Sequence, residues 1–193
     1  MSKNRFEAFS DGVIAIIITI MVMDLRVPQN GGAEVLARLF PAFLSYVLSF
    51  VYIGTYWNNH HHMLHTCTRV TGAMLWANLH LLFWLSLLPF ATGWMGENHF
   101  SSVPSAFYGF ILLMAGIAYW LLQHSIIISQ GTHSLLQKAI GRDWKGKASL
   151  LIYLFATMIA FGSPSLAEGL YVLVAIIWLV PDPRIESALE QEP

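Results

Sequence analysis

The sequence predicts an all-α membrane protein whose chain crosses the bilayer with six transmembrane helices. The composition is the first reason: 56% of the 193 residues are hydrophobic and 11% are charged, whereas soluble domains contain about 25% charged residues. The second reason is a series of six apolar runs separated by polar or helix-breaking segments. The length fits a single domain over residues 1–193, and the net charge of −1 argues against nucleic acid as a partner.

A spanning helix needs about 20 mostly apolar residues, which sets the expected bounds. The spans are expected at residues 6–25, 35–60, 70–94, 104–129, 148–162 and 166–180. The last two are short, so they could be tilted or form one interrupted hairpin. Residues 130–147 are too polar to span, and they predict an interfacial loop with a short helix at 135–140. The acidic tail, 184–193, is expected to be mobile.

The basic residues predict the orientation of the chain. Six spans put both termini on one side of the membrane, and eight of the ten Lys and Arg residues fall on that side: Lys3, Arg5, Arg69, Lys138, Arg142, Lys145, Lys147 and Arg184. Only Arg26 and Arg38 fall on the other. Because cytoplasmic loops carry the excess of Lys and Arg, both termini are expected to be cytoplasmic.

The first span has an unusual polar entry. Arg5, Ser10 and Asp11 run directly into the apolar stretch that follows. A carboxylate at the edge of hydrocarbon is costly unless it has a partner or water, so it indicates a functional site. This helix is therefore interpreted as the wall of an ion pathway. Ile16, Ile20 and Met23 share one stripe of it. A plain lipid-facing helix is the alternative, since such a helix is apolar on every face.

Four histidines, His60, His61, His62 and His65, stand at the end of the second span. Histidines four apart on a helix can chelate zinc. However, no acidic residue follows them in a metalloprotease pattern or lies near them in the sequence, so no metal site is predicted. His60 with Trp57 is instead expected to be a structural partner of Asp11 or Ser10. The chain contains no recognisable catalytic constellation, so an enzyme is not expected.

Several motifs resemble those of the lysosomal potassium-channel family, transmembrane protein one-seven-five, in its bacterial form. They are the pattern Arg5-x-x-x-Phe9-Ser10-Asp11, the pattern Trp57-x-x-His60-His61, and Asn78 with the later run 88–92, Leu-Pro-Phe-Ala-Thr. The first of these is the most specific. The six-span plan, with a basic loop between the fourth and fifth spans, also fits the family.

The resemblance implies a potassium-selective, voltage-independent leak channel in the cell (inner) membrane, with K+ as the permeant ion and no cofactor. It implies a homo-tetramer in the lipid bilayer whose first helices line a central pore. A hydrophobic constriction would fall on Ile16, with Ile20 and Met23 as further layers and Thr19 as a hydroxyl layer. The motif residues would form the network that holds the first helix in place: Arg5, Phe9, Ser10, Asp11, Trp57, His60 and Asn78.

Two other functions remain open at this point. One is a proton-coupled or proton-permeable transporter that uses Asp11 and the histidines. The other is a membrane metalloenzyme at His60–His65, which would require a bound metal and an acidic partner.

Overall fold

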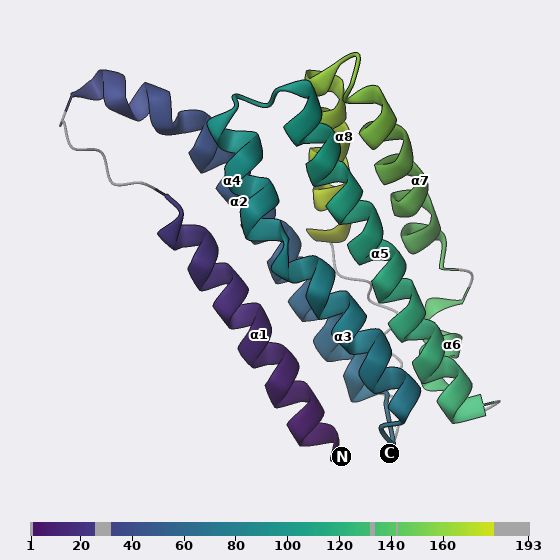
Figure 1. Ribbon diagram of the computed structural model, residues 1–193. Helices are drawn as coiled ribbons and strands as arrows, with labels where there is room; N and C mark the ends of the chain where they lie inside the picture. Colours follow the sequence, from purple (N-terminus) through teal and green to yellow (C-terminus); the bar gives the residue numbers. More distant parts are fainter. Residues whose placement is uncertain (1, 26–31, 132–133, 142, 180–193) are drawn as a thin grey trace.

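The computed structural model is a helical bundle (Figure 1) and describes residues 2–25, 32–131, 134–141 and 143–179. Within these ranges the regular elements are all α-helices. They are α1 (Lys3–Met23), α2 (Ala33–His65), α3 (Gly72–Ser86), α4 (Leu88–Glu97), α5 (Ser102–Gln130), α6 (Leu135–Ile140), α7 (Trp144–Ile159) and α8 (Pro164–Leu179). The tail that was expected to be mobile lies outside the described residues.

Four helical stretches in the described part of the chain are long and apolar enough to cross a membrane: 3–23, 35–65, 72–97 and 102–130. They correspond to the first four expected spans. The helices at the last two expected spans, α7 and α8, have 16 residues each. A straight helix of that length covers about 24 Å, less than the hydrocarbon thickness of about 30 Å. The expected short helix at 135–140 is present as α6.

The third expected span is not one continuous helix. It divides at Leu87 into α3 and α4. Pro89 explains the break, because proline has no N–H to donate to the carbonyl four residues earlier and its ring crowds that carbonyl. As a result, Pro89 occupies the first turn of α4, where a missing N–H is tolerated. The second expected span is also longer than predicted, since α2 continues past His60 to His65.

The first helix lies at the edge of the bundle (Figure 1) and contacts α2, α3 and α4. The centre of the bundle is formed by α5, which packs against α3 and α4 on one side and against α7 and α8 on the other. The α7–α8 hairpin therefore lies far from α1 (Figure 1). Within the described residues of a single chain, this arrangement leaves one long face of α1 without a neighbour.

Close packing between α5 and α8 depends on Gly109. A Cβ atom at this position would overlap the hydroxyl of Tyr171 and would press against Thr157. Tyr171 is fully buried and donates its hydroxyl hydrogen to the Ser105 carbonyl at 3.1 Å. Small residues at helix contacts let the backbones approach closely.

Basic segments gather at one end of the bundle. The start of α1, the end of α2, the end of α5, α6 and the start of α7 lie at the same end (Figure 1). The first turn of α1 carries Lys3 and Arg5, the α2–α3 connection carries Arg69, and α6 carries Lys138. The described residues therefore preserve the charge asymmetry on which the predicted orientation depends.

Candidate functional site on the first helix

The first helix has two contrasting faces. Phe6, Ser10, Ile14, Ile17 and Met21 are buried against the rest of the chain. Their spacing of three or four residues is that of a single helix face. The residues expected to form the constriction lie on the opposite side. Ile16 is 60% exposed, Ile20 46% and Met23 76%, and Thr19 is also exposed.

The uncovered face of α1 differs in composition from other exposed apolar faces of the bundle. Between Phe9 and Met23 it contains Gly12, Ala15 and Thr19 among its exposed residues, together with the isoleucines. The exposed apolar face of α2 instead carries several phenylalanines, and that of α3 carries tryptophan and phenylalanine. Small residues permit close approach of a second helix. The α1 face is thus suited to lie near other copies of itself.

A buried polar chain attaches α1 to α2 and α3. The His60 Nε2 lies 2.8 Å from the Oδ1 of Asn78, and the Asn78 Nδ2 donates to the Ser10 Oγ at 2.9 Å. Ser10 in turn donates to the Phe6 carbonyl at 3.1 Å. Ser10, Asn78 and His60 are all essentially inaccessible to solvent. Each of the three side chains is hydrogen-bonded within this chain, as low-dielectric surroundings require.

Asp11 is bonded to Trp57, one of the two residues that the sequence indicated as partners of Asp11 or Ser10. The Trp57 Nε1 donates to the Asp11 Oδ1 at 3.0 Å. Neither Arg5 nor His60 is hydrogen-bonded to Asp11 among the described residues. Arg5 and Phe9 are exposed and lie on the uncovered side of α1, so they are not part of the buried chain.

An acidic residue lies near the histidine tract in space, although none lies near it in the sequence. Because α2 continues to His65, the rings of His61 and His65 stand one turn apart with centroids separated by 4.5 Å. Glu7 of α1 reaches the same place, and one ligand atom from each of the three residues lies within 4.8 Å of the others. Sequence reasoning missed Glu7 because it is far from the histidines along the chain.

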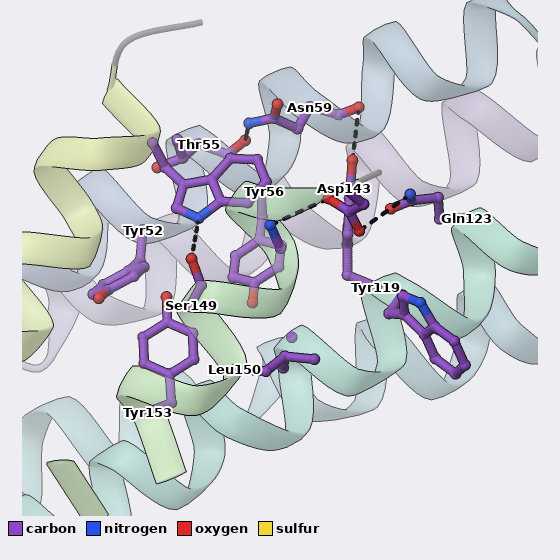
Figure 2. A pocket seen from close by; sticks show the side chains of 14 residues that line it. Tyr52, Thr55, Tyr56, Asn59, Tyr119, Gln123, Asp143, Ser149, Leu150 and Tyr153 are labelled. Atoms are coloured by element: carbon purple, nitrogen blue, oxygen red, sulfur yellow. Dashed lines mark hydrogen bonds between the residues drawn. The ribbon is translucent and has the colours of Figure 1, made fainter. Parts of the chain in front are cut away.

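A separate pocket lies on the other side of α2, between α2, α5, α7 and α8 (Figure 2). Its walls include Tyr52, Tyr56, Tyr119 and Tyr153. The cavity volume is about 50 Å³, enough for a few water molecules. Its polar groups largely bond to one another: Gln123 donates to Asp143, Trp178 donates to Ser149, and Asn59 donates to the Thr55 carbonyl. This pocket is a polar part of the interface between these helices and is remote from α1.

At the far end of α1, an open groove of about 540 Å³ lies between the helix end, the start of α2 and α4. Met23, Asp24, Arg38 and Glu97 are among its lining residues. The uncovered stripe of α1 therefore runs from the basic end of the bundle to a groove with charged walls.

An all-helical bundle with four candidate membrane spans is the architecture of an integral membrane protein. The family described as "Endosomal/lysosomal potassium channel TMEM175" matches residues 5–89. A potassium channel of Chryseobacterium sp. (strain P1-3) is 51% identical over 191 residues, which cover 99% of this chain and all of that one. The chain belongs to the TMEM175 family.

Other relatives place the chain within this family in more detail. A potassium channel of Chamaesiphon minutus is 31% identical over 90% of this chain and 91% of its own. The crystal structure of a lysosomal potassium-selective channel TMEM175 homolog from the same organism matches with a TM-score of 0.81 at 29% identity, over 93% of this chain and 97% of that one. The human endosomal/lysosomal proton channel TMEM175 is 34% identical over 103 residues, 20% of its length. These relatives are ion channels, and the chain is not an enzyme.

Proposed function

We propose that the chain is one subunit of a homo-tetrameric, potassium-selective leak channel of the cell (inner) membrane. The full-length relatives that are named potassium channels support this proposal. A single domain, residues 1–193, would cross the bilayer six times, with α7 and α8 as short spans where the bilayer is locally thinned and both termini in the cytoplasm. The basic residues at one end of the bundle support this orientation.

The uncovered stripe of α1 is the observation that carries the proposal. Ile16, Ile20 and Met23 are exposed while the opposite face of the same helix is buried. One helix cannot enclose a pore, so several copies must meet around an axis, and closed cyclic symmetry is the common solution. With α1 innermost, each subunit would present this stripe to the axis and keep its buried chain toward its own bundle.

The constriction would be built from layers along α1. Ile16 lies five residues beyond Asp11, about 7.5 Å along the helix axis, and Met23 lies about 10.5 Å further. Rings of Ile16, Ile20 and Met23 side chains would form a neck that dewets when narrow and conducts when widened. Partial dehydration in such a neck would penalise Na+ more than K+, because Na+ holds its water more tightly.

Thr19 is suited to a hydroxyl layer in this neck. Its hydroxyl donates to the Ala15 carbonyl at 2.9 Å, which uses the hydrogen and leaves the oxygen lone pairs available. A cation is coordinated by lone pairs and is repelled by a donated hydrogen. In a tetramer, four hydroxyl oxygens would thus point their lone pairs, the negative end of the hydroxyl dipole, toward a passing K+ ion.

The motif residues would divide into two groups. The chain from His60 through Asn78 to Ser10, together with the Trp57–Asp11 hydrogen bond, would fix the rotation of α1. Arg5 and Phe9 lie on the uncovered side. They would contact neighbouring subunits at the cytoplasmic mouth.

Potassium flux in liposomes tests the proposal. Purified protein should release trapped K+ faster than trapped Na+, and its native mass in detergent should correspond to four chains. K+ flux at the rate of empty liposomes would contradict the proposed function. Flux from protein with a monomeric mass would contradict the proposed pore.

A proton-permeable transporter that uses Asp11 and the histidines is the second candidate. The observation in its favour is that vertebrate relatives matching 103 residues of this chain are named proton channels. A pH-sensitive dye inside K+-free liposomes distinguishes the two. Proton entry that is lost in Asp11→Asn while K+ flux persists would support this candidate, and saturable, coupled flux would identify a carrier.

A further inference from the structure

We infer that Glu7, His61 and His65 bind a divalent cation of the Zn²⁺ class, which joins the first helix to the second. The inference rests on three side chains that no part of the proposed conduction mechanism uses. Glu7 comes from α1, and the two histidines come from the last turns of α2. One potential ligand atom of each lies within 4.8 Å of the other two.

The geometry of the three side chains is close to that of a bound state. His61 and His65 are four residues apart on a continuous helix, so they share one face. Ligand atoms about 2.1 Å from a common tetrahedral ion are about 3.4 Å apart, so small side-chain rotations would complete the site. His65 is exposed and Glu7 is only partly buried, which leaves an entry path and a position for a water ligand.

Glu7 supplies a second, independent indication of a ligand. Its Oε1 is buried and has no hydrogen-bond partner among the described residues. A buried carboxylate oxygen without a partner is costly, so such a group needs a compensating cation or water. The Lys3 ammonium donates to the nearby His65 carbonyl at 3.0 Å and makes no hydrogen bond to the Glu7 Oε1.

The ligand set decides which class of ion is favoured. Two imidazoles and one carboxylate suit Zn²⁺ and its first-row neighbours, whereas Mg²⁺ and Ca²⁺ prefer sets of oxygen ligands. Two histidines, one carboxylate and a water form a four-coordinate zinc site. Because Glu7 is on α1, the bound ion would cross-link the N-terminal end of this helix to α2.

Zinc binding to the full-length, untagged oligomer tests the inference, with competition against a zinc-sensitive dye as the readout. Wild type should bind one Zn²⁺ per chain. His65→Gln and Glu7→Gln should each weaken binding by at least tenfold, since even outer-shell partners of metal ligands are worth 10–100-fold. His62→Gln is the matched control, because His62 belongs to the same tract and is outside the cluster; it should bind as wild type does.

Thermal unfolding gives a second readout that does not depend on conduction. Zn²⁺ should raise the unfolding temperature of wild type and of His62→Gln, and should leave the two ligand variants unchanged. Absence of zinc binding by wild type would overturn the inference. An equal loss of zinc affinity in His62→Gln would assign binding to the histidine tract in general and would also overturn the inference. Wild-type zinc affinity in Glu7→Gln would show that α1 contributes no ligand, which overturns it as well.

Discussion

Replacement of Asn78 by alanine should destabilise the attachment of α1 more than replacement of either of its neighbours in the buried polar chain, Ser10 or His60. Asn78 is 1% exposed and is the middle member of the chain that links three helices. Alanine removes the acceptor for His60 and the donor to Ser10. Ser10 retains its bond to the Phe6 carbonyl, whereas the His60 Nε2 is left without the partner it has in the native structure.

The magnitude follows from the two bonds that are lost. A buried hydrogen bond contributes about 0.5–1.5 kcal/mol net, and a buried group left unpaired costs about 1–3 kcal/mol. Coupling between side chains inside membrane proteins is smaller on average, about 0.6 kcal/mol. Two lost bonds and one stranded imidazole therefore predict a loss of about 2–4 kcal/mol in the free energy of unfolding.

The assay is the equilibrium unfolding of reconstituted protein, with the fraction of intact oligomer after heating as a second measure. Asn98→Ala is the matched control, because Asn98 is exposed and its side-chain amide donates to the Trp94 carbonyl one turn earlier at the end of the same helix, so no helix–helix contact is lost. It should change stability by less than about 0.5 kcal/mol. A double-mutant cycle with Ser10→Ala should give a coupling of about 0.5–1.5 kcal/mol. An Asn78→Ala protein as stable as the control would refute the structural role of this chain.

Three further outcomes are expected. Trp57→Phe should lower oligomer stability by about 0.5–1.5 kcal/mol, because it removes the donor to Asp11. Asp11→Asn keeps an acceptor for Trp57, so it should lower stability less. Thermal unfolding measures both variants, and a larger loss in Asp11→Asn would contradict Trp57 as the partner of Asp11. Gly109→Ala should lower the free energy of unfolding by about 1–3 kcal/mol, because the added methyl group overpacks against Tyr171. Gly169→Ala is the control and should not lower it, because a Cβ atom there meets nothing within 4 Å. Equal stability of the two variants would argue against the close contact at Gly109. Native mass spectrometry should give four chains per particle, and a dimer would exclude the proposed pore.

The positions of most helices were predictable from the sequence, because apolar runs and helix-breaking residues are local signals. The short helix α6 is an example: Ser134 accepts from the Gln137 N–H at one end, and Gly141 adopts a φ of +58° at the other. The break at Leu87 was missed although Pro89 was visible. A proline in an apolar run can kink a helix or divide it, and the sequence does not decide between the two.

The candidate site was less predictable, because it depends on helix rotation and on contacts distant in the sequence. Arg5 and Ser10 belong to one motif, yet five residues at 100° each put them about 140° apart around the helix. The helix phase therefore indicates that both cannot join the same buried chain. No local signal brings Glu7 to His61 and His65, since that contact depends on the length of α2 and on the packing of α1 against it.

Paired potassium and sodium flux through Ile16→Asn tests the central claim, that α1 lines the ion pathway, most directly. Ile176→Asn on α8 is the matched control, because Ile176 is 55% exposed and Ile16 is 60% exposed. A polar ring at Ile16 should relieve dewetting and reduce the cost of passing a hydrated ion. At matched protein incorporation, Ile16→Asn should raise conductance and bring K+ and Na+ flux close to equal, while Ile176→Asn should leave the flux ratio unchanged. Ile16→Asn could instead keep the wild-type ratio of K+ to Na+ flux and lose stability to the same extent as Ile176→Asn. That result would place Ile16 against lipid and contradict the account.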